Sequence, residues 1–326
     1  MEFEFEKTLQ PLRDEIAKLE AKRLKGDSTA SSKLSTLQRR LDTETAHLYA
    51  KLSPWDTVQV ARHPGRPTIT QYASTMCDEF IELHGDRVFG DDKALIGGLA
   101  RIDQRRFMLI GHRKGVTVEE NIAYNFGMAN PEGYRKAMRL MHLAEKWGLP
   151  VVTMVDTSGA FPGLEAEARG QAEAIGRNLM EMSALETPIL TIVTGEGGSG
   201  GALGIAVGDR VLMLQYAVYS VISPEGCASI LWRDGAKAPD AAKALHITST
   251  DLSDLHVIDG IIPEPVGGAH RNNGEAIANV RKAVLENLAA LSGISASRLV
   301  DMRYKKFTAM GRFQSPSKQK TVLGNK

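Results

Sequence analysis

The spacing of hydrophobic residues differs between the first fifty residues of this chain and the rest. In the first part, leucine and isoleucine recur every three or four positions, which is the spacing of one face of an α-helix. These positions lie on both sides of a breaker cluster at 26–32, namely Leu9, Leu12, Ile16 and Leu19, then Leu34, Leu37, Leu41, Leu48 and Leu52. The pattern predicts an N-terminal helical hairpin over residues 1–55. Its apolar stripes must be buried, either on the body of the chain or against a partner in a dimer.

From about residue 95, short continuous apolar runs alternate with helical segments. The runs 95–100 and 106–111 flank Asp103-Gln104 and predict a β-hairpin. Further strands are predicted at 150–155, 188–193, 211–214 and 218–222. Continuously apolar strands that alternate with helices indicate an α/β fold with a mostly parallel sheet, buried on both faces.

The helical segments carry start and stop signals. Pro131 suits the first turn of a helix, and Gly148 suits the position just after its end. Another helix is predicted over 165–183. The C-terminal part is predicted to be helical over 274–291 and 295–310, before a polar tail that is predicted to be disordered.

Charge and cysteine content exclude several classes of function. The 326 residues include 40 Lys and Arg against 39 Asp and Glu, a net charge of +1. This balance offers no bulk attraction for nucleic acid or an anionic membrane. No apolar stretch reaches the ~18 residues of a membrane span, and the acidic N-terminus is no secretory signal, so we expect a cytoplasmic protein. Cys77 and Cys227 lie far apart without a C-x-x-C pair, which predicts neither a metal site nor a disulfide.

The segment 195–202, GEGGSGGA, is the main candidate for chemistry. Such a density of glycine is typical of a backbone that takes positive φ or lies very close to a ligand. It follows the predicted strand 188–193, and a helix is predicted to begin at about Gly200. Amides at a helix start lack intrahelical acceptors and favour anions or developing oxyanions.

Three mechanisms fit this segment. The dinucleotide-binding fingerprint G-x-G-x-x-G also requires an acidic residue at the end of the next strand, and the residues 214–216 contain none. The G-x-S-x-G nucleophile elbow would use Ser199, with Asp259 and His270 following in the right order. However, Ser199 is predicted to lie several glycines beyond the strand rather than at the turn. The third is an oxyanion hole without a nucleophile, formed by the amides of Gly200 and Gly201.

Two other segments follow predicted strands. In 156–163, DTSGAFPG, the first four residues resemble an aspartic protease motif, but that chemistry needs two such carboxylates and the chain has one copy. A turn capped by Asp156 and a direct ligand role are equally compatible with this segment. In 222–228, Ser223 and Pro224 predict a capped helix start, which is favoured over an acid/base role for Glu225.

Several long motifs, in order, resemble one family. They are NFGMANPEGYRKAMRLMHLAEKWGLP at 125–150, DTSGAFPG at 156–163, GEGGSGGA at 195–202, YSVISPEGCASILW at 219–232 and IIPEPVGGAHRN at 261–272. The family is the alpha subunit of the bacterial and plastid acetyl-CoA carboxylase carboxyltransferase. The resemblance covers nearly the whole chain, including the N-terminal hairpin, and family members often have proline where Ser158 stands.

The resemblance implies a crotonase-like (ClpP/crotonase) ββα spiral over 56–313, between the hairpin 1–55 and a disordered tail at 314–326. It implies transfer of the carboxyl group of carboxybiotin, held by the biotin carboxyl carrier protein, to acetyl-CoA. The product is malonyl-CoA for fatty acid biosynthesis, and this chain binds no cofactor covalently. Implied partners are a beta subunit in an α2β2 assembly, which holds most of the CoA and a zinc ion, and the ATP-using biotin carboxylase. The implied location is the cytoplasm, or the stroma of a plastid.

In that reaction the base is the ureido anion of biotin, so the protein must stabilise oxyanions rather than supply a base. We expect Gly200 and Gly201 to be the catalytic donors, toward the carbonyl of biotin. Substrate contacts are expected from Gly197, Gly198, Ser199, Gly159, Gly163 and Gly111, the last in a stretch, 111–115, expected to supply a second donor. A bulky residue at Gly201 is expected to abolish transfer and leave the fold intact. The rivals are an α/β serine hydrolase that uses Ser199, and a scaffold subunit whose partner alone does the chemistry.

Overall fold

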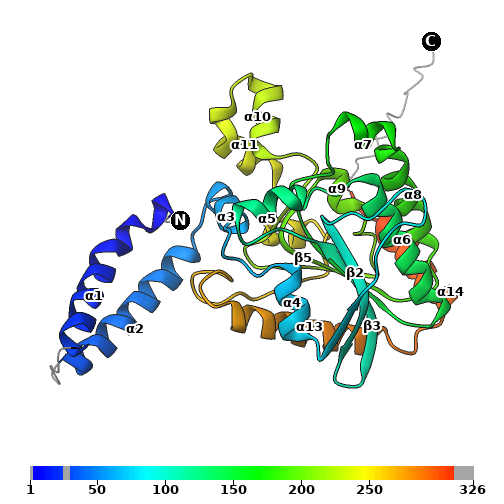
Figure 1. Ribbon diagram of the computed structural model, residues 1–326. Coiled ribbons are helices and arrows are strands. Elements are labelled where there is room, and N and C mark those ends of the chain that lie inside the picture. The colour runs from blue at the N-terminus through cyan, green and yellow to red at the C-terminus, as the bar shows by residue number, and fades with distance from the viewer. Residues whose placement is uncertain (1–2, 25–29, 312–326) are drawn as a thin grey trace, which may run out of the picture.

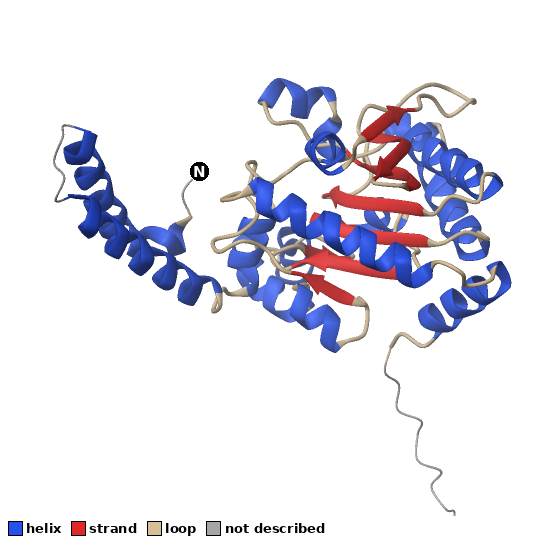
Figure 2. Ribbon diagram, turned by 90° about the horizontal axis from the view of Figure 1, so that it is seen from below, coloured by secondary structure: helices blue, strands red, loops and turns tan. Residues whose placement is uncertain are grey.

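The computed structural model describes residues 3–24 and 30–311. The predicted disorder of the tail 314–326, and part of the breaker cluster 26–32, therefore lie outside the described residues. Within them, eight strands form a single mixed sheet (Figure 2). The strand order is β1-β2-β3-β4-β5-β6-β8, and β7 pairs with β5. The strands are β1 (Glu79–Glu82), β2 (Leu95–Ile102), β3 (Arg105–His112), β4 (Val151–Thr157), β5 (Ile189–Gly198), β6 (Arg210–Leu214), β7 (Val218–Ser220) and β8 (Gly260–Ile262).

The sheet confirms the predicted α/β fold. From β3 to β8 the neighbouring strands are parallel, and β4 and β5 are almost entirely buried. β2 pairs antiparallel with both of its neighbours, β1 and β3. The predicted hairpin is confirmed, because Ile102 pairs with Arg105 across the two-residue turn Asp103-Gln104. β1 was not predicted, since its four residues alternate between half-buried and exposed and contain no apolar run.

Helices pack on the sheet in two layers (Figure 1). α6 lies against β2 and β3 and packs on α8, whereas α13 lies against β5 and β8 and packs on α4. No helix in the described part of the chain is long and apolar enough to cross a membrane. The helices of the body are α3 (Pro54–Ala61), α4 (Ile69–Met76), α5 (Val118–Ala123), α6 (Pro131–Lys146), α7 (Leu164–Ala168), α8 (Gln171–Ala184), α9 (Ser199–Leu203), α10 (Pro224–Trp232), α11 (Ala238–Leu245), α12 (Ser249–Asp254), α13 (Asn273–Leu291) and α14 (Ala296–Thr308).

One predicted helix is wrong in a way that matters for the site. The segment 165–183 was expected to be continuous, but α7 ends at Ala168 and α8 begins at Gln171. Gly170 between them has φ of 85°, a left-handed conformation that glycine adopts without steric cost. After the break, the side chain of Gln171 donates to the carbonyl of Phe161 in the loop that follows β4, and Arg169 pairs with Glu132 at the start of α6.

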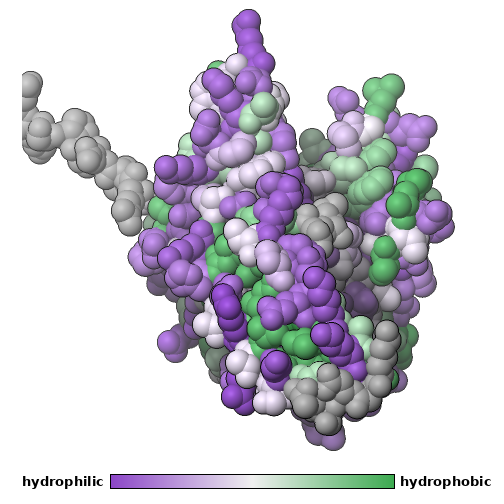
Figure 3. Space-filling model, turned by 90° about the vertical axis from the view of Figure 1, so that its left-hand side faces the viewer, coloured by the Kyte–Doolittle hydropathy of each residue, from purple (hydrophilic) through white to green (hydrophobic). Residues whose placement is uncertain are grey.

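The N-terminal helices project from the body (Figures 1 and 2). A short 3₁₀ helix (Glu4–Leu9) leads into α1 (Gln10–Leu24), and α2 (Ala30–Tyr49) lies beside α1. Their apolar stripes are buried mainly against each other, through Leu12, Ile16 and Leu34, rather than on the body. The face of the molecule on this side is mostly hydrophilic, with smaller hydrophobic patches between polar side chains (Figure 3).

A buried carboxylate attaches this projection to the body. The Glu6 side chain is 1% exposed and pairs with Arg271 at 2.5 Å and with Arg13 at 3.1 Å. It also accepts a hydrogen bond from the hydroxyl of Tyr49 at 2.9 Å. Burial alone would raise the pKa of Glu6, but these partners outweigh it and the pKa is lowered. Phe3 packs beside the stacked rings of His63 and His270 and closes the junction.

Candidate functional site

The first part of the glycine segment, residues 195–198, is not a turn after the strand, as predicted, but the end of the strand itself. β5 continues as far as Gly198, and α9 begins at the next residue. β4 and β7 lie on either side of this end, with Gly197 paired to both Thr157 and Tyr219. The extension follows from these neighbours, which supply backbone partners on both edges. The carboxyl end of a central parallel strand is where α/β folds place their ligands.

The glycines are needed because other parts of the chain lie very close. A Cβ atom at Gly198 would lie 2.1 Å from the carbonyl oxygen of Ser158. At Gly201 it would lie 2.3 Å from the carbonyl carbon of Gly159 and 2.4 Å from the nitrogen of Ala160. Real Cβ atoms essentially never approach below 3.0 Å. The expectation that a bulky residue at Gly201 would leave the fold intact is therefore wrong, because it would push the loop after β4 away.

Two further glycines of the segment make room for side chains of the protein. A Cβ at Gly195 would lie 2.5 Å from a carboxylate oxygen of Asp156, and one at Gly197 would lie 2.8 Å from the ring of Tyr219. None of the glycines in the segment has a positive φ. The glycine density was predicted to reflect a positive φ or a close approach to a ligand, whereas the close neighbours seen here belong to the chain itself.

Gly200 differs from the other glycines of the segment. Its Cβ would meet only the side chain of Ile175, at an ordinary 3.6 Å. Its amide and that of Gly201 lie in the first turn of α9, where amides have no intrahelical acceptor. Neither donates to a loop, a cap or a side chain among the described residues. The hydroxyl of Tyr134 donates to the carbonyl of Gly201 at 3.2 Å and holds this turn in place.

The loop 156–163 is shaped by its own hydrogen bonds. The hydroxyl of Thr157 accepts from the amide of Gly159 at 3.1 Å and donates to its carbonyl at 2.7 Å. Asp156 accepts from the ammonium of Lys114 at 2.6 Å and from the amide of Glu196 at 3.0 Å. Asp156 therefore connects this loop to the glycine segment. Of the two roles predicted for it, capping of the turn and direct binding of a ligand, these contacts resemble the first.

Gly163 and Gly111 take no part in the contacts between the loop after β4 and the glycine segment. Gly163 precedes α7, and a Cβ there would strike the ring of Phe161 at 2.4 Å. Gly111 is buried inside the sheet, paired with Ile96 on one side and Met154 on the other. At the other end of the 111–115 stretch, the amide of Gly115 is already bonded to the side-chain oxygen of Asn121 at 3.0 Å. The structure thus gives no free donor at either end of this stretch.

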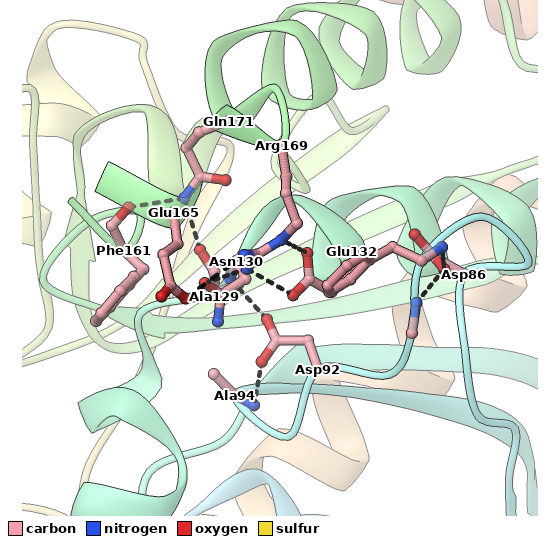
Figure 4. A network of polar contacts seen from close by, with 12 residues as sticks. Asp86, Asp92, Ala94, Ala129, Asn130, Glu132, Phe161, Glu165, Arg169 and Gln171 are labelled. Carbon is pink, nitrogen blue, oxygen red and sulfur yellow. Dashed lines mark hydrogen bonds and ion pairs between the residues drawn. The ribbon is translucent and has the colours of Figure 1, made fainter. Parts of the chain in front are cut away.

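A polar network supports the loop from behind (Figure 4). The amide of Phe161 donates to the carbonyl of Ala129 at 3.0 Å. The side chain of Gln171 donates to the carbonyls of Ala129 and Phe161, at 2.8 and 3.0 Å. Arg169 donates to Glu132 at 3.0 Å. Arg169 and Gln171 were not predicted as part of the site. A signal in the sequence near them is Gly170, the glycine at which the helix breaks.

Asp92 anchors the same network to the strand β2. Its two carboxylate oxygens accept from the amides of Ala94, at 2.9 Å, and Asn130, at 2.7 Å (Figure 4). Burial raises the pKa of Asp92 to about 6, despite these two hydrogen bonds. Asn130 also precedes α6, so the carboxylate fixes the start of that helix.

Two cavities border the glycine segment. One is apolar, about 350 Å³, and is lined by Ser199, Leu203, Ala206, Val211, Tyr219, Ser220, Val221, Leu245, Leu252, Val257, Phe307 and Met310. The other is polar, about 270 Å³, and is lined by Ala61, Arg62, His63, Pro64, Arg66, Thr68, Lys114, Gly115, Asn121, Phe126, Asp156, Ser158 and Glu196. In the part of the chain that the structure describes, no three His, Cys, Asp or Glu side chains are grouped to hold a metal ion.

The charges around the polar cavity are paired. Arg62 bridges Glu196, at 2.6 Å, and Glu225, at 2.5 Å. Arg66 is buried against Glu264 at 2.8 Å, and it also donates to a carbonyl of β5. Glu225 is thus an ion-pair partner with a pKa lowered by Arg62, whose hydrogen bond outweighs burial. None of these groups is a free acid or base.

Ser199 requires a correction. It was expected to lie beyond the turn, but it directly follows the strand and has φ of 49°. A serine in a strained turn between strand and helix is the geometry of a nucleophile elbow, so that argument against a hydrolase is wrong. Among the described residues the missing part is the base, because neither ring nitrogen of the expected partner His270 has a hydrogen-bond partner. Asp259 pairs with Lys306, and His270 stacks on His63, with ring centroids 4.1 Å apart.

The start of α10 confirms the capping prediction. The hydroxyl of Ser223 accepts from the amide of Gly226 at 3.1 Å, and Pro224 is the first residue of the helix.

His112, at the end of β3, was missed by sequence reasoning. Its side chain is 1% exposed, and neither ring nitrogen has a hydrogen-bond partner among the described residues. Burial lowers the pKa of His112 to about 4, against the attraction of the Asp156 charge. The imidazole is therefore neutral at physiological pH. A buried neutral histidine has no signature in the sequence, because its state depends on what surrounds it.

Comparisons with solved structures show the fold. A transcarboxylase 12S structure with methylmalonyl-coenzyme A bound matches with a TM-score of 0.55 and 18% identity, over 84% of this chain and 48% of that one. The beta subunit of geranyl-CoA carboxylase from P. aeruginosa matches with a TM-score of 0.56 and 16% identity, over 76% and 46%. This chain spans about half the length of these solved chains.

Comparisons of sequence show the family. The family model of acetyl co-enzyme A carboxylase carboxyltransferase-like proteins matches residues 2–311. A Geobacter metallireducens protein named acetyl-coenzyme A carboxylase carboxyl transferase subunit alpha is 51% identical over 313 residues, 96% of this chain and 98% of the relative. A Zymomonas mobilis protein of the same name is 52% identical over 308 residues, 94% of this chain and 98% of the relative. The chain therefore belongs to the family of acetyl-coenzyme A carboxylase carboxyl transferase alpha subunits.

Proposed function

We propose that this chain transfers the carboxyl group of carboxybiotin to acetyl-CoA, giving malonyl-CoA, as the alpha subunit of a carboxyltransferase. The observation that carries this proposal is the junction of β5 and α9. It offers backbone amides beside two cavities, whereas the acids and bases around it are engaged in ion pairs. A site of this kind suits a reaction whose base is supplied by the substrate. The names of the relatives, matched over almost their whole length, support the same reaction.

The proposed donors are the amides of Gly200 and Gly201. Preorganised donors of this type each contribute roughly 3 kcal/mol to stabilising a developing oxyanion. The carbonyl of biotin is their proposed acceptor. Gly197, Gly198 and Gly159 would then set the backbone around it through the close packing described above, and Ser199 would line the neighbouring apolar cavity.

The proposed domain organisation is a helical hairpin over 1–55 and a crotonase-like ββα spiral over 56–313. The fold likeness to solved carboxyltransferases supports the second part. The helix α3 begins at Pro54, behind a capping box formed by Ser53 and Asp56, which is close to the proposed boundary.

The proposed partners are a beta subunit, the biotin carboxyl carrier protein and biotin carboxylase, in the cytoplasm. The relatives' printed names describe them as alpha subunits, which supports a beta partner. We place the zinc ion in that partner. The two cysteines of this chain, Cys77 and Cys227, are too few for a zinc site with four cysteine ligands.

The test is a malonyl-CoA formation assay with carboxylated carrier and acetyl-CoA. It compares the purified chain, the beta subunit and the co-purified complex. We expect activity only in the complex, and activity of the beta subunit alone would instead support the scaffold hypothesis. Ser199→Ala in the complex should stay within about threefold of wild type, since an oxyanion hole survives loss of the hydroxyl. Ester hydrolysis by the purified chain that is lost in Ser199→Ala would instead favour the serine hydrolase.

A further inference from the structure

The apolar cavity beside the glycine segment has no charged side chain in its wall. Its polar side chains are Ser199, Tyr219 and Ser220, and the others are apolar. A phosphate or a carboxylate would lose its hydration in such a cavity without gaining a partner. The volume of about 350 Å³ lies in the range of small-ligand pockets, ~300–1,000 Å³. The cavity therefore suits an uncharged ligand with an apolar body.

The three hydroxyl groups of this cavity differ in their partners. The hydroxyl of Ser220 donates to the carbonyl of Ile222 at 2.8 Å, so it is engaged within its own turn. Ser199 is exposed to solvent. The hydroxyl of Tyr219 forms no hydrogen bond with the described residues, and burial alone raises the pKa of this group. Tyr219 thus carries a donor that the protein shields from water and does not use.

A second tyrosine hydroxyl without a partner differs from that of Tyr219 in its access. Tyr72, on α4, is fully buried, and its hydroxyl is closed off from solvent and lines neither of the two cavities. The hydroxyl of Tyr219 is not closed off in this way, since Tyr219 lines the apolar cavity. Native structures keep few buried polar groups without a partner. A donor of this kind on a cavity wall indicates a ligand that enters the cavity.

The ring of Tyr219 is fixed relative to the glycine segment. Tyr219 lies in β7 and pairs with Gly197, and a Cβ at Gly197 would lie 2.8 Å from the ring. Glycine at that position therefore makes room for the phenol. Ser199, which directly precedes Gly200, lines the same cavity as Tyr219. The phenol and the proposed donor amides of Gly200 and Gly201 thus lie at the same end of β5 and are positioned by the same backbone.

Tyr219 also supplies a donor where the predicted one is missing. The stretch 111–115 was expected to provide a second donor, but Gly111 is buried in the sheet and the amide of Gly115 is bonded to Asn121. Tyrosine hydroxyls are among the side-chain groups that stabilise oxyanions in enzymes. Because burial raises its pKa, the hydroxyl of Tyr219 keeps its proton at neutral pH and can donate.

The cavity fits the head of biotin better than it fits coenzyme A. The fused rings of biotin are uncharged and carry one strong acceptor, the ureido oxygen. At ~30 Å³ for each water-sized group, the cavity holds about a dozen such groups, which matches the rings with the first atoms of their chain. An acetyl group would leave most of this space empty. The pantetheine arm of coenzyme A carries two amides and a hydroxyl, which the apolar walls would leave unpaired.

We propose that the apolar cavity receives the fused rings of biotin, and that the hydroxyl of Tyr219 donates to the ureido oxygen beside the amides of Gly200 and Gly201. The inference rests on the proposed function. Tyr219 is then a catalytic residue, because negative charge develops on that oxygen when the ureido nitrogen loses its proton or its carboxyl group. A donor that is in place before the reaction stabilises this charge without reorganisation.

The experiment uses the complex with its beta subunit and follows transfer from malonyl-CoA to free biocytin and to the biotinylated carrier protein. In this direction the carboxyl group moves to the ureido nitrogen, and the proton of that nitrogen goes to the acetyl-CoA formed. Tyr219→Phe keeps the ring against Gly197 and removes only the hydroxyl. It should lower kcat about a hundredfold with both acceptors and leave the KM for malonyl-CoA within about twofold of wild type. The midpoint of urea unfolding should not fall, since no internal hydrogen bond is lost.

Tyr72→Phe is the matched control, because it also removes a buried hydroxyl without a partner, but one that lines neither cavity. Its kcat should stay within about twofold of wild type. Val221→Trp tests the occupant of the cavity. Val221 lies on the cavity wall and is 71% exposed, so a larger side chain there narrows the cavity without entering the core. This variant should raise the KM for biocytin about tenfold and leave the KM for malonyl-CoA unchanged.

The inference is overturned if Tyr219→Phe and Tyr72→Phe have the same kcat. It is also overturned if Tyr219→Phe loses stability along with activity, because the hydroxyl would then have a structural role. A higher KM for malonyl-CoA in Val221→Trp, with the KM for biocytin unchanged, would place the coenzyme A substrate in the cavity instead. If the wild-type complex transfers to neither acceptor, the proposed function itself fails.

Discussion

Gly200 and Gly201 are neighbours in one helical turn, yet the structure predicts opposite results when each is replaced by alanine. At Gly201, the new Cβ would lie 2.3 Å from the carbonyl carbon of Gly159 and 2.4 Å from the nitrogen of Ala160. Both are backbone atoms, so the loop after β4 must move by about 1 Å to restore van der Waals contact. At Gly200, the Cβ would meet only Ile175, at 3.6 Å.

The magnitudes follow from this difference. Overpacking against backbone should cost Gly201→Ala about 1–3 kcal/mol of unfolding free energy. A displacement of about 1 Å beside the reacting groups should lower kcat about a hundredfold. Gly200→Ala should keep kcat within about threefold and gain up to about 1 kcal/mol, since alanine favours the helix.

The assay is malonyl-CoA formation by the complex with its beta subunit, together with denaturant unfolding of each variant. Both variants keep every backbone amide, so only the position of the amides and the loop differs between them. Wild-type kcat and stability in Gly201→Ala would refute the reasoning. An equal loss of kcat and of stability in the two variants would also refute it, because the different contacts of the two positions would then have no effect.

Two further predictions concern buried charges. The pKa of His112 is lowered to about 4, below its unfolded value of about 6.5, so its contribution to stability is present above pH 6.5 and is lost as the pH falls toward 4. As the pH falls over that range, the free energy of unfolding measured in urea should decrease by about 3 kcal/mol more for wild type than for His112→Leu. The same dependence on pH in both proteins would contradict the burial argument. Arg66→Met strands the buried carboxylate of Glu264 and should cost about 3–5 kcal/mol in the same measurement, whereas Arg40→Met at an exposed pair should leave the midpoint unchanged. A small loss in Arg66→Met would mean that water reaches Glu264.

Features that depend only on residues nearby in the sequence could be predicted. The turn at Asp103-Gln104, the start of α6 at Pro131 and the cap of α10 at Ser223 all lie where the pattern indicated. Each depends on backbone preferences within a few residues, which the sequence states directly. The apolar strands at 150–155 and 188–193 were also found, because a strand buried on both faces has to be continuously apolar.

The site depends on contacts between segments far apart in the chain. The length of β5 could not be predicted, because its glycines are held in the strand by Thr157 and Tyr219 on the two neighbouring strands. The same limit explains the wrong expectation for Gly201. Its close neighbours Gly159 and Ala160 are 42 and 41 residues away in the sequence, yet an added Cβ at Gly201 would lie only 2.3 Å from the first and 2.4 Å from the second. The sequence by itself determined the fold class, the buried central strands and that a glycine-rich backbone lies at the carboxyl end of one of them. Only the tertiary structure decided which glycine has room and which carboxylates are neutralised, because steric contact and ion pairing depend on distance in space.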